Sequence, residues 1–465
     1  MRKVLLAVFV AMITAFSFGM AQAEQIDGLR TNSGPALPLG LDVFVNPGDL
    51  GDALIGGYYN ARGNLDMISL VNTSTNTGVV VKVRFREGKY SNEVLDFFVC
   101  LSAGDRWTAW VWGDDDTGNP AHILVWDDDT PTYPDFGSAN MQDLKYSGTG
   151  AASCVTADMT KEGYFTVIAV ASWADPTPGV LRVVQTDEEC GEVLGIYDAD
   201  DFCVGVADCD IENLIDAGNF LTGTVAIYDV VGGAAAYAYN MTALADFRNA
   251  PVGNPGLGLD DPPTFADCQD GLNGLNYILM KDNLIALYDI ESILGAQSDV
   301  IITFPTKTQT ITAVGVQNPF QGLVDIDDCR WDPDSDPCEP VAVTLWDDEE
   351  NSPECTHGFS PSTTTDLELC NEVNYIVVGE SADSLMDTDL LQFKIQMNGF
   401  DIGWINFNFT GHMLADRQIG LPTAATPDAT AYGLPVIGYE LGSLIEGFYG
   451  HMLPLRYTSD IDEPS

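Results

Sequence analysis

Basic residues are scarce in this chain, which has 19 Lys and Arg against 69 Asp and Glu and a formal net charge of −50 at pH 7. The few cations are scattered, whereas a nucleic-acid partner requires a basic stripe that neutralises phosphates. Nucleic acid is therefore excluded as a partner. The acidity is typical of colloidal solubility, for example in salty water. Disorder does not explain it, because 46% hydrophobic and 10% aromatic residues can bury a sizeable core.

The sequence also lacks any C-x-x-C spacing and has only four histidines, none of them paired at ligand spacing. Covalent haem attachment, zinc ribbons and thioredoxin-like redox sites all depend on such spacings. We therefore expect no haem, and we expect no nucleotide cofactor either.

Long apolar runs are absent beyond the N-terminus. Residues 1–23 have two early charges, an apolar run from Val4 to about Phe18 and an Ala21-Gln22-Ala23 exit, which together indicate a cleavable secretory signal. The run is shorter than the roughly 20 residues that a spanning helix needs. We expect a mature chain that begins near Glu24, has no membrane span, and is secreted, at the cell surface or in the periplasm.

Ten cysteines in an exported chain predict disulfides, since such compartments are oxidising. We expect five bridges: Cys100 with Cys154, Cys190 with Cys203, Cys209 with Cys268, and two among Cys329, Cys338, Cys355 and Cys370.

Through most of the chain, apolar and polar residues alternate with a period of two. In "VVVKVRFRE" the residues Val79, Val81, Val83 and Phe85 share one face and the charged residues share the other, as in a half-buried strand. Similar short strands joined by turns recur through the chain. Helices are few, and the best candidates are 209–218 and 275–291, both in the second half.

These patterns predict an all-β protein built from tandem antiparallel β-sandwich (Ig-like) domains. The strand periodicity lapses in an acidic, cysteine-containing stretch near the middle of the chain. We divide the sequence into the signal 1–23, a first sandwich 24–185, a connection 186–215 and a second sandwich 216–465.

Several phrases carry a resemblance to known proteins. "LVNTSTNTGVVVKVRFREGKYSNEVLDFFVCLSAGDRWTAWV", "TKEGYFTVIAV", "SDVIITFPTKT", "VTLWDDEE" and "GLPVIGY" occur in this order. Over roughly residues 50 to 455 the chain resembles a group of exported bacterial proteins that are described only as hypothetical or cell-surface proteins. The resemblance implies export and a place at the cell surface, and it assigns no activity or site residue.

Catalytic motifs are missing. Residues 379–383 (GESAD) match the nucleophile elbow G-x-S-x-G except at the last position, where Asp383 replaces the glycine that the strained turn needs. His412 and His451 follow downstream, and we interpret them as surface or strand-end residues. We expect the protein not to be an enzyme.

Four tryptophans surround two acidic loops: Trp107, Trp110, Trp112 and Trp126. Exposed indoles would form a sugar-stacking platform, but aromatic side chains on half-buried strands usually face the core, and we expect core packing. Glycoside hydrolysis needs two carboxylates about 5 to 9.5 Å apart. With 69 acidic residues, the sequence cannot single out such a pair.

Three acidic clusters are candidate metal sites: Asp114, Asp115 and Asp116; Asp127, Asp128 and Asp129; and Asp332, Asp334 and Asp336. Alternate aspartates in a loop can present several of the six to eight oxygens that calcium requires. The last cluster departs from an EF-hand, since Pro337 takes the glycine position and Val343 that of the bidentate glutamate. We interpret it as a non-EF calcium loop next to Cys329 or Cys338, with plain solvated turns as the alternative.

Together these observations predict an exported, disulfide-stapled structural or adhesive cell-surface protein, stabilised by calcium and able to assemble with itself into a layer or filament. Its partner is then a second copy or a cell-surface polysaccharide. The alternative is a secreted protein that binds or hydrolyses carbohydrate.

The calcium hypothesis predicts that chelation lowers the melting temperature, and more so at low salt, because bare carboxylates in one loop repel each other. Calcium at a hundredfold excess over Kd stabilises by about 2.7 kcal/mol. Melting of the parent and of Asp334→Asn with calcium, magnesium and chelator checks this. A midpoint that never moves contradicts calcium binding, and a calcium shift that survives Asp334→Asn moves the site to another cluster.

Overall fold

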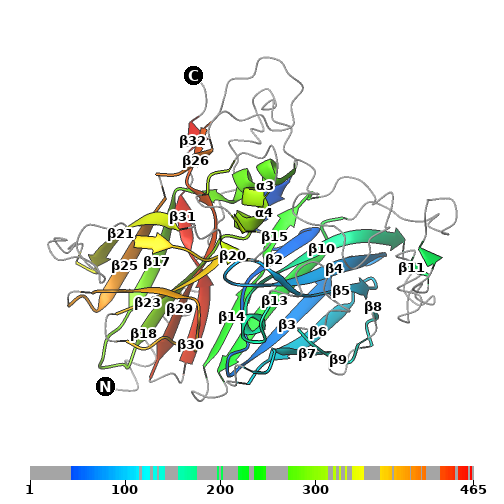
Figure 1. Ribbon diagram of the computed structural model, residues 1–465, viewed down its shortest axis with the longest axis horizontal. Coiled ribbons are helices and arrows are strands. Elements are labelled where there is room, and N and C mark those ends of the chain that lie inside the picture. Colours follow the sequence, from blue (N-terminus) through cyan, green and yellow to red (C-terminus); the bar gives the residue numbers. More distant parts are fainter. Residues whose placement is uncertain are drawn as a thin grey trace.

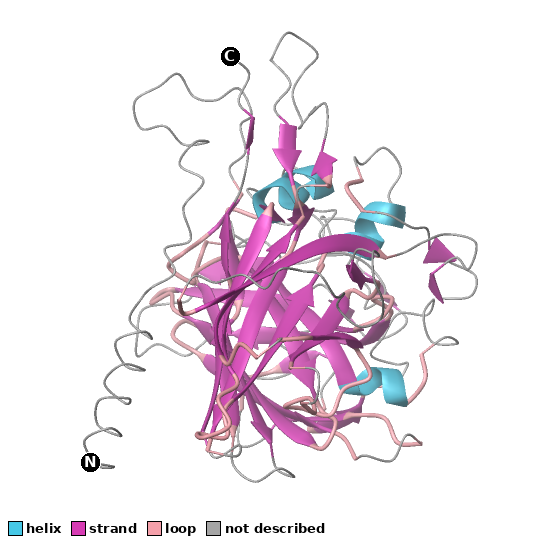
Figure 2. Cartoon of the chain, turned by 90° about the vertical axis from the view of Figure 1, so that its left-hand side faces the viewer, coloured by secondary structure: helices cyan, strands magenta, loops and turns pink. Residues whose placement is uncertain are grey.

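The fold is described from a computed structural model of the chain. It covers residues 43–114, 118–125, 129–133, 136–141, 155–174, 196–197, 201–202, 218–229, 235–247, 271–312, 318–320, 324–325, 330–331, 338–349, 367–379, 382–397, 399–409, 411–414, 430–445, 449–458 and 461–462. Strands form the body of the molecule, and the short helices lie at its periphery (Figure 2). The prediction of an all-β protein with antiparallel sheets is confirmed.

The first sandwich pairs a seven-stranded sheet with a six-stranded sheet (Figure 1). The seven-stranded sheet has the order β1 (Phe44–Val45), β15 (Thr242–Ala245), β2 (Ala53–Asn60), β10 (Glu162–Ala174), β4 (Thr77–Glu87), β5 (Glu93–Leu101) and β8 (Thr132–Tyr133). The six-stranded sheet has the order β14 (Ala236–Asn240), β13 (Leu221–Asp229), β3 (Asn64–Asn72), β6 (Arg106–Trp112), β7 (His122–Val125) and β9 (Ser138–Asn140).

The second sandwich pairs two five-stranded sheets. The sheet that we call the central sheet has the order β24 (Leu391–Ile395), β23 (Val373–Val378), β18 (Gln297–Thr303), β29 (Ile437–Leu444) and β30 (Tyr449–Pro454). The distal sheet has the order β22 (Leu367–Leu369), β21 (Glu339–Asp347), β25 (Ile402–Asn408), β17 (Asn283–Asp289) and β31 (Arg456–Thr458). The pairing of β23 with β24 is parallel, unlike its neighbours.

Short elements complete the described part of the chain. The helices are η1 (Asp158–Lys161), α3 (Gly271–Leu279) and α4 (Lys307–Thr312). The small sheets are β11 (Ile196–Tyr197) with β12 (Asp201–Phe202), β16 (Met280–Lys281) with β28 (Leu434–Pro435), β19 (Val324–Asp325) with β20 (Arg330–Trp331), and β27 (Thr430–Tyr432) with β26 (Met413–Leu414) and β32 (Ile461–Asp462).

The central sheet is buried on both faces. On β18, Ile301 belongs to the hydrophobic core of the first sandwich, while Val300 and Ile302 belong to the core of the second. On β23 the same alternation places Tyr375 in the first core and Ile376 in the second. The short apolar run of a strand such as "VNYIVV" is typical of a strand buried on both faces. This sheet therefore joins the two sandwiches.

Two sequence expectations differ from the structure. The predicted helix 275–291 is helical only to Leu279, and the strands β16 and β17 follow, because the residues of β17 alternate between the core and the outer face. The helix predicted at 209–218 lies outside the described residues, apart from Gly218. The range 216–465 was assigned to the second sandwich, yet β13 pairs with β3 and β15 pairs with β2 of the first.

Strand β4 is buried on both faces rather than half-buried. Val81 and Val83 face the core, as the period predicts. Lys82 and Arg84 on the opposite face are also buried, and they form ion pairs with carboxylates of β5. The alternation identified the strand correctly but could not show that the charged face is covered.

The junction between the sandwiches is tightly packed where β2 meets β18 and β29. Thr303 Oγ1 donates a hydrogen bond to the Gly57 carbonyl at 2.6 Å. The Tyr439 ring lies 4.5 Å from that of Tyr239, measured between centroids, and Tyr239 Oη donates to the Tyr58 carbonyl at 2.5 Å. A Cβ added to Gly57 would lie 2.7 Å from the Tyr439 ring, so this close approach requires glycine.

We expect Gly57→Ala to lower the free energy of unfolding by about 1–3 kcal/mol, because the buried Tyr439 ring cannot move away from the added methyl group. Denaturant unfolding followed by fluorescence measures the change. Gly137→Ala is the matched control, since a Cβ there meets nothing within 4 Å. Equal stability of the two variants would contradict the packing of this junction.

Candidate functional site

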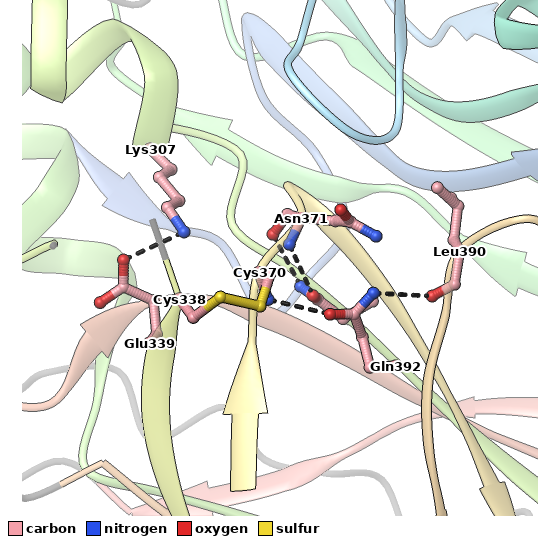
Figure 3. The surroundings of a disulfide bond; sticks show 8 residues. Lys307, Cys338, Glu339, Cys370, Asn371, Leu390 and Gln392 are labelled. Atoms are coloured by element: carbon pink, nitrogen blue, oxygen red, sulfur yellow. Dashed lines mark hydrogen bonds and ion pairs between the residues drawn. A yellow bond between two sulfur atoms is a disulfide. The ribbon is translucent and has the colours of Figure 1, made fainter. Parts of the chain in front are cut away.

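A disulfide joins Cys338 to Cys370 in the second sandwich (Figure 3). The two cysteines flank the paired residues Glu339 and Leu369 of β21 and β22. One of the two bridges predicted among the last four cysteines is thereby confirmed. Cys100 is also disulfide-bonded. Its predicted partner and the other cysteines lie outside the described residues: Cys154, Cys190, Cys203, Cys209, Cys268, Cys329 and Cys355.

The acidic clusters lie mostly outside the described residues, and only Asp114 and Asp129 are described, both of them exposed. Within the described part of the chain, Cys338, Glu368 and Cys370 are the group with metal-ligand spacing. The two sulfurs of this group are bonded to each other, so neither offers the thiolate that a metal needs. The calcium hypothesis for Asp332, Asp334 and Asp336 stays a prediction.

The tryptophans divide between the two faces of the six-stranded sheet. Core packing is confirmed for Trp107, which is fully buried. It is wrong for Trp110 and Trp112, which lie half-buried on the opposite face, because the register of β6 alternates its side chains. Trp126 lies outside the described residues.

The exposed side of this sheet carries a group of apolar and aromatic side chains that we call the outer aromatic face. Trp112 stacks on His122 with centroids 5.5 Å apart, and Trp110 lies 6.2 Å from Tyr228. Strand register places Met67 and Leu124 beside Trp110, and Leu65 between Trp112 and Tyr228. The face comprises Leu65, Met67, Trp110, Trp112, His122, Leu124 and Tyr228.

Polar side chains border the outer aromatic face. Ser69 and Thr108 pair directly across β3 and β6, in the row next to Trp110, and Thr224 continues this row on β13. Ser138 and Asn140 lie beside Leu124 and His122 at the opposite edge. An aromatic centre with a polar border is typical of a recognition surface.

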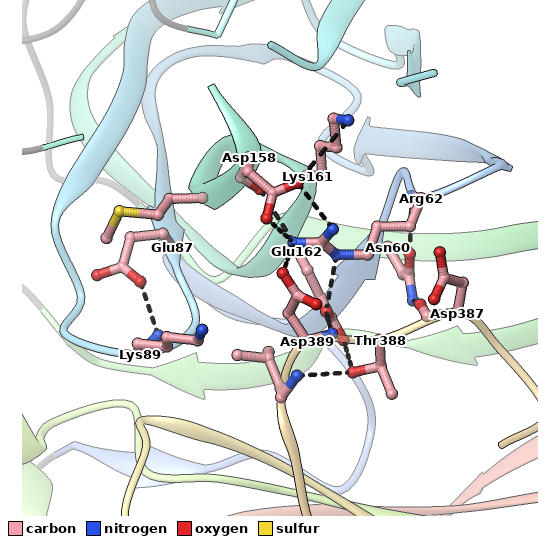
Figure 4. Close-up of polar contacts among 12 residues, drawn as sticks. Asn60, Arg62, Glu87, Lys89, Asp158, Lys161, Glu162, Asp387, Thr388 and Asp389 are labelled. Atoms are coloured by element: carbon pink, nitrogen blue, oxygen red, sulfur yellow. Dashed lines mark hydrogen bonds and ion pairs between the residues drawn. The ribbon is translucent and has the colours of Figure 1, made fainter. Parts of the chain in front are cut away.

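A second polar cluster lies at the junction of the sandwiches (Figure 4). The Arg62 guanidinium contacts Asp158 at 2.9 Å and Glu162 at 3.3 Å in the first sandwich, and Asp389 at 2.9 Å in the segment between β23 and β24. Asn60 Nδ2 donates to the Asp387 carbonyl at 2.8 Å. The cluster therefore fixes the second sandwich to the first.

Glu162 is the centre of this cluster and is fully used by it. Its Oε1 accepts from Tyr58 and Thr388, and its Oε2 accepts from Arg62 and the Asp389 backbone N–H. Four donors occupy the directions that the two carboxylate oxygens offer. Burial raises the pKa of Glu162, and the hydrogen bonds and Arg62 oppose that shift. The arrangement is that of a structural joint, because no oxygen of Glu162 is left for a substrate.

The motif GESAD at residues 379–383, which resembles a nucleophile elbow, is described only in part. Gly379 directly follows β23 and has φ 114°, and Glu380 and Ser381 lie outside the described residues. Both His412 ring nitrogens face backbone carbonyls, those of Pro319 and Pro340. Of the two places that we expected for His412, the surface is wrong because the ring is buried, and the strand end fits because the residue directly precedes β26. His451 is exposed on β30, in line with the expectation.

Several carboxyl groups are buried and have raised pKa values. Burial raises the pKa of Asp299 to about 7, although Tyr375 and the Leu385 N–H donate hydrogen bonds to its Oδ2 at 2.6 Å. Burial likewise raises the pKa of Glu372 and of Glu440 to about 7. These groups therefore keep their protons to higher pH than an exposed carboxyl group does.

Sequence reasoning missed the outer aromatic face and the junction cluster for different reasons. The alternation of "RWTAWVW" already separated Trp107 from Trp110 and Trp112, so that face could have been found. No local signal connects Arg62 with Asp389, because residues far apart in sequence meet only after the sandwiches pack.

Comparisons with protein-family models, curated proteins and solved structures find no match to this chain. The resemblance to exported cell-surface proteins therefore stays a prediction. Among the residues that the structure describes, no helix is long and apolar enough to cross a membrane.

The buried carboxyls predict that stability falls as pH rises. Asp299 has a pKa of about 7 when folded and of about 3.9 when unfolded, so its contribution is fully present below about pH 4 and is lost as pH rises through about 7. We expect the free energy of unfolding to decrease between about pH 5 and 8, with about 2–4 kcal/mol of that decrease due to Asp299. Urea unfolding at several pH values measures this.

The matched variants are Asp299→Asn and Asp348→Asn, which remove one carboxyl each, buried in the first case and exposed in the second. Asp299→Asn should flatten the pH dependence and Asp348→Asn should leave it unchanged. Equal pH profiles for Asp299→Asn and the parent would contradict the burial of a titrating carboxyl at this position.

Proposed function

We propose that this protein is an exported, non-enzymatic adhesive protein of the cell surface that binds uncharged polysaccharide through the outer aromatic face. The observation that carries the proposal is the exposure of Trp110, Trp112 and Tyr228 on a sheet whose other face is the core. Large aromatic side chains left half-exposed on a folded sheet favour contact with a ligand.

The chemistry of the face suits a sugar. Indole and phenol rings stack on the apolar side of a pyranose ring, while the hydroxyl and amide groups of Thr108, Ser138 and Asn140 can exchange hydrogen bonds with sugar hydroxyls. A sheet face is broad and open, which fits an extended chain of sugars better than a single small molecule.

The charge of the protein favours an uncharged ligand. A net charge of −50 repels acidic polysaccharides and also opposes contact between two copies of this chain. The exposed Asp114 lies two residues beyond Trp112, so negative charge is also present beside the face. Calcium bound to the acidic clusters would reduce this repulsion and stabilise the protein.

Self-assembly into a layer or filament is the second candidate. A specific observation favours the face over the sheet edges as its contact surface, because most edge strands of the four large sheets have two or three residues: β1, β8, β9, β22 and β31. Short edges discourage pairing between chains. Assembly would then use the outer aromatic face, and it would need a counterion.

Two observations support export, which is the remaining part of the proposed function. The disulfide Cys338–Cys370 fits an oxidising compartment, and the N-terminal residues 1–23 have the pattern of a secretory signal.

We expect Trp110→Ala and Trp112→Ala together to weaken binding to an insoluble uncharged polysaccharide at least about tenfold, because truncating a contact aromatic typically costs more than 1 kcal/mol. Depletion assays with cellulose, chitin and a β-glucan measure bound protein against free protein. The parent should bind at least one of these matrices.

Trp404→Ala is the control. Trp404 lies half-buried on the distal sheet and stacks on Trp346 with centroids 4.0 Å apart, so its variant tests loss of an indole elsewhere. Binding of Trp404→Ala should match the parent. Failure of the parent to bind any matrix, with calcium-dependent oligomers that vanish in the Trp110 and Trp112 double variant, would replace polysaccharide binding by self-assembly.

A further inference from the structure

Lys82 and Asp96 form a buried ion pair on the face of the seven-stranded sheet that points away from the sandwich core. Lys82 Nζ lies 2.8 Å from Asp96 Oδ2, and the two side chains are 1% and 0% exposed. They lie on the neighbouring strands β4 and β5, where Lys82 pairs with Phe98 and Asp96 pairs with Arg84.

The surroundings of this pair are apolar on one side. The Lys82 ammonium lies 5.4 Å from the centre of the buried Phe98 ring, and Ile168 pairs with Lys82 from β10. Burial lowers the pKa of Lys82, and it raises the pKa of Asp96 to about 7. Both shifts reduce the cost of the neutral amine and the neutral carboxylic acid at this position.

We propose that Lys82 and Asp96 condense into an intramolecular isopeptide bond. The lone pair of the Lys82 amine attacks the Asp96 carboxyl carbon, and a C–N bond forms. The carbon–hydroxyl bond of Asp96 then breaks, the amine nitrogen loses one proton to the leaving hydroxyl group, and one water molecule is released. The balance needs no oxidant or cofactor, and the product amide replaces two charges by a neutral group.

Two neighbouring residues shape this reaction. Glu93 Oε2 accepts from Arg84 Nε at 2.7 Å, and its charge acts on both Lys82 and Asp96. We assign Glu93 as a positioning residue that holds the Arg84 guanidinium beside the pair. Arg84 also lies 3.6 Å from Asp96 Oδ2, and Glu93 is its closer partner.

A second buried pair of a lysine and a carboxyl group lies in the second sandwich. Lys307 Nζ lies 3.0 Å from Glu339 Oε1, and both side chains are fully buried (Figure 3). His412 Nδ1 lies 3.6 Å from the other oxygen of Glu339. We restrict the proposal to Lys82 and Asp96, which are the closer of the two pairs.

Peptide mapping of the full exported chain, reduced, alkylated and digested with trypsin, tests the proposal. Acylated Lys82 blocks cleavage, so we expect no peptide that ends at Lys82. A branched peptide that contains both Lys82 and Asp96 should replace it, with a mass one water below the sum of its two parts. Lys82→Met should give only linear peptides.

Glu93→Gln is a second variant that retains both reacting groups. We expect its cross-link to form more slowly by at least about tenfold, because Arg84 then pairs with Asp96 and lowers the pKa of that carboxyl group. A parent digest with the linear peptide ending at Lys82 and no branched peptide would reduce the pair to an ordinary ion pair and overturn the proposal. A Glu93→Gln variant cross-linked as fast as the parent would overturn the role of Glu93.

Discussion

The central sheet is the constraint on which the whole molecule depends, because each of its faces forms one wall of a hydrophobic core. Ile301 and Tyr375 pack toward the first sandwich, and Val300 and Ile376 pack toward the second. A sheet that is apolar on both faces cannot lose either partner without exposing a large hydrophobic area to water. The two sandwiches are therefore one body in which neither half is expected to fold to completion alone.

Several of the few basic side chains lie inside the fold. Arg62, Lys82 and Lys307 all lie buried beside carboxylates, so cations that the chain does have neutralise acids inside the fold. Burial makes a carboxyl group costly to ionise, as the raised pKa of Asp299 indicates. The outer surface consequently keeps its negative charge, and this favours partners that carry none.

The sequence predicts strands well and their environment less well. Period-two alternation in "VVVKVRFRE" located β4, but the burial of Lys82 depends on what covers the outer face, which no local pattern encodes. Residues 275–291 were predicted as a helix, because a short apolar segment fits the periodicity of a helix as well as that of a strand. In the structure, β17 pairs with β25, and this long-range pairing makes the segment a strand. Residues 221–245 return to the first sandwich by long-range pairing, which likewise has no local signal. Of the candidate site, only the tryptophans of β6 could have been predicted from the sequence.

The junction combines two kinds of interaction with different consequences. Hydrophobic burial around Tyr239 and Tyr439 supplies the larger part of the free energy, but it is not directional and would tolerate several orientations of the sandwiches. The contacts of Arg62 and Glu162 with Asp389 require one orientation, because a shift would leave buried charges unpaired. The polar cluster therefore selects the angle at which the core can form. The outer aromatic face of the six-stranded sheet is in this way held in a fixed direction relative to the second sandwich, which a flexible linker between two independent domains could not do.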